Sequence, residues 1–267
     1  MRWSLLVGAI GATALGCFAT EPAGVEVEQT GAFIVGGAGR ITDVAFDATT
    51  GHLLAIDAAR VTEVSTAGEL VATYDLGPAE TPEGVLSGTY EAVGVAPDGD
   101  ILVTSSDANG WRLSRASLAF DWYFCLDAPD MPHGVAVWSN GGVGVDAAGL
   151  AIYTMPSLGT NNDLVSSDLE QYDMVSGFPL QEAELESAGV RSTGVAFVPE
   201  RGTLLVSDRD RLLEISTDGR VLSRHDVPRT RGAGGIAGVA YDASTGTVFL
   251  VDDADARRVT VNRIVHW

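Results

Sequence analysis

The sequence of 267 residues contains no lysine, only two cysteines, and few aromatic residues (7%). All 16 basic residues are arginine, against 36 Asp and Glu, and the formal net charge is −20. Without lysine, the chain cannot form a Schiff base or use a lysine as a general base. The acidic excess repels phosphate backbones and anionic headgroups, so we expect no nucleic-acid partner and no electrostatic membrane binding.

Long apolar runs are also scarce. Beyond the N-terminus no segment approaches eighteen uncharged apolar residues, so we expect no membrane span there. The N-terminus, MRWSLLVGAIGATALGC, combines Arg2, a short apolar stretch and small residues, which predicts a signal peptide over 1–16. Its ALGC resembles the lipobox of bacterial lipoproteins, which implies a lipidated Cys17, while ordinary cleavage near Ala19 is the alternative. The chain is therefore expected in the bacterial cell envelope, lipid-anchored with the outer membrane favoured, or periplasmic or secreted.

The two cysteines do not predict a disulfide. If Cys17 carries lipid, Cys125 has no partner, even in an oxidising compartment. Cys125 lies in the apolar run DWYFCLD, where it is predicted to be a small buried residue rather than a nucleophile.

What the chain does contain is an internal repeat. Residues 44–76 align without a gap on residues 195–227, and thirteen of the thirty-three aligned positions are identical. VAFDATTG at 44–51 also returns as VAYDASTG at 239–246, and weaker copies occupy the middle of the chain. One valine anchors each copy: Val44, Val95, Val145, Val195 and Val239. The unit therefore recurs every 44–51 residues.

Each unit has the pattern of four short strands. An alternating segment such as DVAFD leads through a glycine turn to a nearly continuous apolar strand such as HLLAID. Third and fourth strands follow, joined by turns such as STAG and STDG, where glycine supplies the left-handed residue. A continuous apolar second strand is expected when neighbouring sheets cover both of its faces. This period predicts an all-β chain folded as a β-propeller of four-stranded blades.

The last unit lacks one strand. Three strands follow Val239, whereas an additional strand, GAFIVGG at 31–37, precedes the first unit. We expect this strand to complete the last blade as its outer strand. Five blades result, and a degenerate sixth over 118–142 is the alternative. The predicted division of the chain is a signal peptide over 1–16, a flexible linker over 17–30 and a single propeller domain over 31–267.

The stretch GVAFVPERGTLLVSDRDRLLEISTDGRVLSRHDV, residues 194–227, carries the repeat most clearly. It resembles propellers of the NHL and SdiA-regulated type, a resemblance that implies the fold without specifying an activity. Asp57, Asp208 and Asp252 end the second strand of their units. Because they repeat with the blade, they are predicted to cap turns rather than to bind metal. Arg60 and Arg211, with Glu63 and Glu214, are likewise predicted to form surface or inter-blade pairs.

The candidate ligand-binding residues lie just before the anchors. Sites in propellers commonly lie at the mouth of the central channel, where the first strand of each blade begins. Residues at this place differ from unit to unit, as expected of positions that serve a ligand. The candidates are Asp43, Glu91, His133, Arg191 and Thr193.

PHGVAV at 132–137 is the most specific local signal. It resembles the first strand of a blade in zinc lyases of the NHL class, which act on peptidyl α-hydroxyglycine, and in streptogramin lyase. The zinc lyases need three histidines from three blades. Equivalent positions here hold Asp43, Glu91 and Ser192, so we expect no zinc site and a hydrogen-bonded His133.

Calcium is the remaining cofactor to weigh. Lactonases of the gluconolactonase type would place an asparagine where this chain has STG or PHG. Asp43 and Glu91 could still give oxygen ligands to calcium. The sequence has no nucleophile elbow, P-loop, HExxH motif or pair of CxxC motifs.

Two functions are therefore left open. In the first, an exported and lipid-anchored monomeric propeller binds an unknown protein or small-molecule ligand, with no catalysis and no cofactor. In the second, the chain is a calcium-dependent hydrolase, a lactonase or phosphoesterase, with its site at the channel mouth.

Overall fold

The structure is a computed structural model. It describes residues 25–77, 80–81, 84–85, 89–105, 109–125, 137–146, 151–158, 168–176, 178–184, 192–208, 210–228, 235–252, 255–265 and 267. The predicted signal peptide, Cys17, His133 and Arg191 lie outside these residues. In the described part, no helix is long and apolar enough to cross a membrane.

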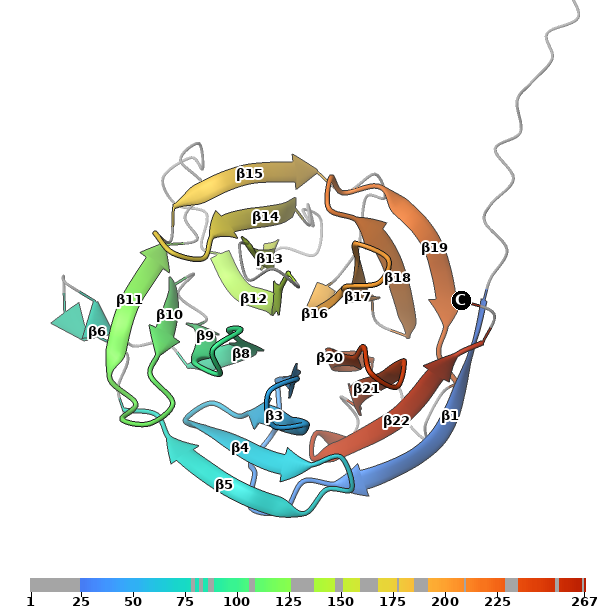
Figure 1. Cartoon of the computed structure of the whole chain (residues 1–267), viewed down its shortest axis with the longest axis horizontal. Helices are drawn as coiled ribbons and strands as arrows, with labels where there is room; N and C mark the ends of the chain where they lie inside the picture. The colour runs from blue at the N-terminus through green and yellow to red at the C-terminus, as the bar shows by residue number, and fades with distance from the viewer. Residues whose placement is uncertain are drawn as a thin grey trace, which may run out of the picture.

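The described residues form 22 strands arranged around one central axis (Figure 1). They are β1 (Val25–Ile34), β2 (Asp43–Asp47), β3 (His52–Ile56), β4 (Arg60–Ser65), β5 (Leu70–Asp75), β6 (Glu80–Thr81), β7 (Gly84–Val85), β8 (Tyr90–Val95), β9 (Ile101–Ser105), β10 (Asn109–Leu113), β11 (Phe120–Cys125), β12 (Val137–Val145), β13 (Ala151–Leu158), β14 (Asp168–Asp173), β15 (Pro179–Glu184), β16 (Ser192–Val198), β17 (Thr203–Asp208), β18 (Arg211–Ser216), β19 (Val221–Asp226), β20 (Ile236–Asp242), β21 (Thr247–Asp252) and β22 (Arg258–Ile264).

The strands group as the sequence predicts. β2–β5, β8–β11 and β12–β15 each make a four-stranded sheet. β16–β19 and the set β1, β22, β21, β20 are joined into one eight-stranded sheet, and β6 pairs only with β7. The prediction of an all-β propeller is confirmed. The segment weighed as a further blade, 118–142, gives β11 to one sheet and the start of β12 to the next.

Burial follows the position of each strand in its sheet. The second strands β3, β9, β17 and β21 are buried along almost their whole length, because neighbouring sheets cover both faces. The outer strand β5 is mostly exposed or half-buried. The core therefore lies between successive sheets, as in the cluster that joins Leu54 and Ile56 of the first sheet to Val103 and Trp111 of the second.

The turns between first and second strands use glycine as predicted. Gly51 has φ +73° and Gly246 has φ +68°, values that favour glycine over any L side chain. Before each glycine, an aspartate holds the turn. Asp47 accepts hydrogen bonds from Thr49 and Thr50, and Asp242 accepts them from Ser244 and Thr245.

The ring is closed by β1. It pairs antiparallel with β22, placing Phe33 opposite Val259 and Gly31 opposite Val261. Its first residues also pair in parallel with β19, Val25 with His225. The expected outer strand is thus present, but it begins at Val25 rather than Gly31, so residues 25–30 are not linker. The start of β1 was not predicted because its sequence is charged: Glu26 and Glu28 face outward on either side of the buried Val27.

The repeated carboxylates act structurally where their contacts are described. Asp57 accepts backbone N–H bonds from Gly39, Ala59 and Arg60, which confirms a turn-capping role. Asp252 lies 3.5 Å from the guanidinium of Arg258.

A buried network joins the first two sheets. Arg115, in the turn after β10, pairs with Asp47 and lies 2.8 Å from Oε2 of Glu63. Glu63 also accepts hydrogen bonds from the hydroxyl of Tyr74 (2.7 Å) and from His52 (2.6 Å). Burial alone would raise the pKa of Glu63, but the hydrogen bonds from Tyr74, His52 and Arg115 outweigh it and lower the pKa. Glu63 therefore forms an inter-blade pair, but the predicted partner was wrong: its cation is Arg115, whereas Arg60 lies near Asp57 and Asp75.

Candidate functional site

The innermost strand of each sheet borders the central channel, and each contacts the next around the ring. These five innermost strands are β2, β8, β12, β16 and β20. Three of them carry a glycine at which the backbone of the next strand comes close. A Cβ on Gly194 would lie 2.5 Å from the backbone nitrogen of Val239, and one on Gly238 would lie 2.9 Å from that of Val44. Gly142 faces the backbone nitrogen of Val195 in the same way. We call this ring of close contacts the glycine level.

The glycine level also corrects the alignment of the middle units. Gly94 meets Val143, and the backbone nitrogen of Val93 faces the first sheet. The valines equivalent to Val44 are therefore Val93 and Val143, each two residues before the anchors Val95 and Val145. Both segments read V-G-V, so either valine fits the repeat in sequence. Only the contact between strands distinguishes them.

Asp43 occupies the glycine level on β2. Where three other innermost strands carry glycine, β2 places a carboxyl that is 1% exposed. The backbone N–H of Val93, on the next strand, donates to its Oδ2 at 3.2 Å. Its Oδ1 is buried with no hydrogen-bond partner of normal geometry and lies against Gly238.

This environment changes the titration of Asp43. Burial raises its pKa well above the ordinary 3.8, although the N–H groups of Val44, Val93 and Val239 act in the opposite direction. Asp43 therefore keeps its proton at pH values where an exposed aspartate has lost it. A neutral carboxyl can donate a hydrogen bond or a proton, which a carboxylate cannot.

The other predicted site residues are only partly described. Glu91 is half-buried on β8, two residues before the valine that bonds Asp43. The backbone of Thr193 lies in β16, but its side chain is outside the described residues, as are His133 and Arg191. Among the residues that the structure describes, no group of three or more His, Cys, Asp or Glu could hold a metal ion.

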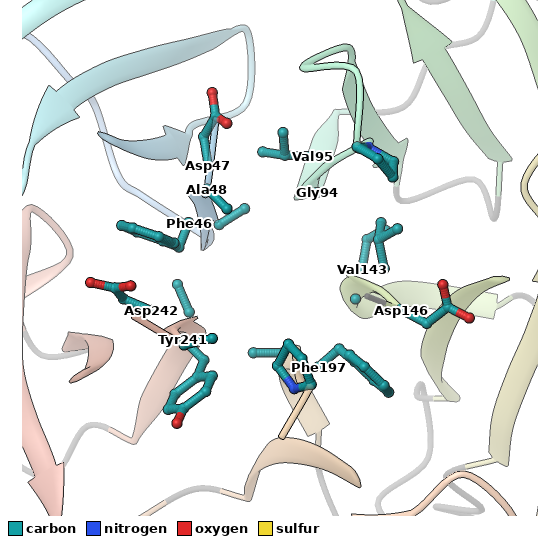
Figure 2. A pocket seen from close by; sticks show the side chains of 18 of the residues that line it. Phe46, Asp47, Ala48, Gly94, Val95, Val143, Asp146, Phe197, Tyr241 and Asp242 are labelled. Atoms are coloured by element: carbon teal, nitrogen blue, oxygen red, sulfur yellow. The ribbon is translucent and has the colours of Figure 1, made fainter. Parts of the chain in front are cut away.

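A cavity of about 530 Å³ opens at the other end of the channel, where the innermost strands lead into the second strands (Figure 2). We call it the downstream cavity. Side chains from all five innermost strands form its wall, chiefly Phe46, Val95, Val145, Phe197 and Tyr241. Val143, Val195 and Val239 also line it, so its floor is next to the glycine level, whereas Asp43 is not part of its lining.

Two of the aromatic residues in the wall pack against aromatic rings outside the cavity. Phe46 stacks on Phe249 with ring centroids 6.2 Å apart. Tyr241 packs edge-on against Trp267 at 5.4 Å, and its hydroxyl donates to Glu200. Burial, followed by the hydrogen bond to Glu200, raises the pKa of Tyr241, so this residue stays neutral.

The charges around the cavity are negative. Asp47, Asp146 and Asp242 lie at its periphery (Figure 2), and none of the described residues that line it is Arg, Lys or His. Arg115 offsets the charge of Asp47 from outside the lining. The turn donors that bond the Asp242 carboxylate are the N–H and hydroxyl of Ser244 and the hydroxyl of Thr245, which are neutral.

The sequence did not predict this cavity, because the candidate residues all lie at the mouth where the innermost strands begin. A signal was present, however. An aromatic residue follows the anchor by two positions in three units, at Phe46, Phe197 and Tyr241, and the outer strands lack such a series. An aromatic residue repeated on a strand next to the axis points into the channel or against the neighbouring sheet.

Comparisons with known proteins show the fold alone. No family model matches the chain, and no curated protein matches it by sequence. Among solved structures, the glutaminyl cyclase of Myxococcus xanthus matches with a TM-score of 0.62 and 12% identity, covering 92% of this chain and 100% of the cyclase. A gluconolactonase from Xanthomonas campestris matches with a TM-score of 0.55 and 14% identity, covering 83% of this chain and 71% of that one. The chain thus shares the propeller fold of two enzymes.

Proposed function

We propose that this chain is an enzyme that acts on a carboxylic-acid derivative, a lactone or an amide, with Asp43 as its proton donor. The observation that carries the proposal is a buried carboxyl with a raised pKa on the innermost strand β2. Glycine fills the same place on three other strands, so the repeat itself does not need a carboxyl there. Buried titratable groups with strongly shifted pKa values cluster at functional sites.

The two structural neighbours support this class of reaction. A gluconolactonase is named for a lactone, and a glutaminyl cyclase for ring closure at a glutaminyl residue. Both substrates are carboxylic-acid derivatives, and departure of the leaving group from either is assisted by a proton donor.

The chemistry is simplest for a lactone. The oxygen of water bonds to the carbonyl carbon, and the bond from that carbon to the ring oxygen breaks. Asp43 gives its proton to the departing ring oxygen and recovers one from the attacking water. The neutral acid is the active form, so turnover should fall as the pH rises through the raised pKa of Asp43.

Calcium enters no step of this proposal. The N–H groups of Val44, Val93 and Val239 surround the Asp43 carboxyl with positive dipoles, an arrangement that disfavours a cation. The expectation that Asp43 and Glu91 share a calcium ion is tested by assaying turnover after chelation and after calcium is restored.

The test compares Asp43→Asn with wild type on a δ-lactone and on a peptide with N-terminal glutamine. Asparagine keeps the shape and cannot donate a proton as an acid, so kcat should fall by about 100-fold or more with KM nearly unchanged. Asp218→Asn, an exposed aspartate, is the matched control and should turn over normally. Wild-type activity in Asp43→Asn would reject the assignment.

The second candidate is a binding module without catalysis. It is favoured by the hydrogen bond from Val93 to Asp43, which ties β8 to β2 and would give this carboxyl a purely structural role. Wild-type protein that turns over neither substrate, together with a destabilised Asp43→Asn variant, would support this candidate.

We further propose that the chain is exported and lipid-anchored through Cys17. The proposal is supported by the ALGC segment after a short apolar stretch. Mass spectrometry of the processed N-terminus tests it. A diacylglyceryl group on Cys17 is expected, and a free N-terminus near Ala19 would contradict it.

A further inference from the structure

We propose that the downstream cavity binds a small organic cation with an apolar body, such as a quaternary ammonium compound. Its volume of about 530 Å³ lies in the range of ligand pockets. This site is separate from Asp43 and would serve to bind a ligand rather than to transform it.

The walls suit an apolar cation. Phe46, Phe197 and Tyr241 come from three different innermost strands and lie along one side of the opening (Figure 2). An aromatic face carries partial negative charge and attracts a cation within about 6 Å of the ring centre. The hydroxyl of Tyr241 donates to Glu200, and a carboxylate acceptor pushes electron density into the phenol ring. Tyr241 is therefore a stronger partner for a cation than an unassisted tyrosine.

The periphery selects the sign of charge. Three aspartates and no basic residue contribute to the described lining, and Arg115, outside the lining, offsets the charge of Asp47 alone among the three. An anion would be repelled there, and the chain's net charge of −20 reinforces this preference by raising the local concentration of cations.

The site is also rigid before a ligand arrives. Asp47 and Asp242 each accept hydrogen bonds from an N–H group and two hydroxyl groups of their own turn. Phe249 and Trp267 support Phe46 and Tyr241 from behind. In a preformed site, little binding free energy is lost to the ordering of side chains.

The experiment uses choline and its neutral isostere 3,3-dimethylbutan-1-ol, titrated separately into the purified protein by calorimetry. Choline should bind about fivefold to thirtyfold more tightly than the alcohol, because the two share a shape and differ in charge. Phe197→Ala should weaken choline binding by a similar factor. Phe178→Ala removes an exposed ring from the turn before β15 and should change nothing.

Tyr241→Phe provides a second variant that keeps the ring and its packing. It loses the hydrogen bond to Glu200, so choline binding should weaken while the melting temperature stays near that of wild type. Asp43→Asn should bind choline as wild type does, which separates this inference from the proposed reaction. Equal affinity for choline and the alcohol, no choline binding to wild type, or unchanged binding in a folded Phe197→Ala protein would overturn the proposal.

Discussion

Asp43 and Gly194 occupy equivalent positions on different innermost strands, yet they contact the next strand in different ways. Glycine leaves room for the backbone of the next strand, whereas aspartate reaches across to the N–H of Val93. The repeat therefore requires close approach at this level, and one strand replaces that approach by a polar contact.

Asp43→Asn should remove one contribution to the dependence of stability on pH. The folded state holds the Asp43 proton above the unfolded value of 3.8, so the contribution of Asp43 to wild-type stability falls as pH rises from about 4 to the raised pKa. Asparagine does not titrate. Urea unfolding at several pH values measures the free energy of unfolding of both proteins. The variant should become more stable relative to wild type as the pH rises through this window, and a difference that does not change with pH would contradict a raised pKa.

Gly194→Ala should destabilise the protein by about 1–3 kcal/mol, because the added methyl group would overlap the backbone of Val239. Gly36→Ala is the matched control, since a Cβ there would meet nothing within 4 Å. Thermal unfolding of the two variants measures the difference. An unchanged melting temperature for Gly194→Ala would mean that the strands can separate at little cost.

Asp43 is a candidate from the sequence because it lies just before an anchor valine, at a place that differs between units, and the structure gives that difference a physical meaning. The sequence did not predict the burial or the raised pKa. Both depend on Val93 and Gly238, which lie about 50 and 195 residues away in the chain. No local pattern reports contacts of that kind.

At the scale of the element, the sheets are joined by apolar layers and, between the first two sheets, by the ion pairs of Arg115. Arg115 leaves the turn after β10 to reach two carboxylates of the first sheet. Asp47 is 0% exposed and Glu63 is 4% exposed. Their charges are therefore stabilised by Arg115 and by neighbouring hydroxyl groups rather than by water.

Arg115→Met should destabilise the protein by about 3–5 kcal/mol, because it leaves two buried carboxylates without their cation. Methionine preserves much of the apolar stem. Arg220→Met is the control, because Arg220 pairs with Asp218 where the side chains are 62% and 56% exposed, and its loss should change stability by less than about 0.5 kcal/mol. Chemical denaturation compares the two, and similar losses would refute a special role for Arg115.

The strands themselves were predictable, because period-two alternation and glycine turns are local signals. The sequence also indicated Glu63 as part of a surface or inter-blade pair. It could not name Arg115 as the partner, since that residue lies in a turn of another unit and has no counterpart in the repeat. Partners across a sheet boundary depend on three-dimensional packing, which the repeat does not encode.

At the scale of the whole molecule, β1 is the strand that completes the ring. It covers β22, buries Val27 beside Ile264, and reaches β19 of the preceding sheet. Val27 alone contributes roughly 1.5–3 kcal/mol by its burial.

Removal of residues 25–34 should therefore cause a loss of several kcal/mol and expose the edge of β22, which favours aggregation. A chain that begins at residue 25 is the control and should melt as the full chain does. Thermal unfolding and size-exclusion chromatography test this expectation. A synthetic peptide of residues 25–34 should restore the melting temperature, whereas the same peptide with Val27→Asp should not.

The pairing of β1 with β22 also sets the order of events during synthesis. Phe33 lies opposite Val259, so its partner leaves the ribosome more than 220 residues later, on the order of 10–50 seconds at ordinary translation rates. Until then the nascent chain carries an amphipathic strand with no place to dock. The final joining of the two ends is therefore a post-translational step.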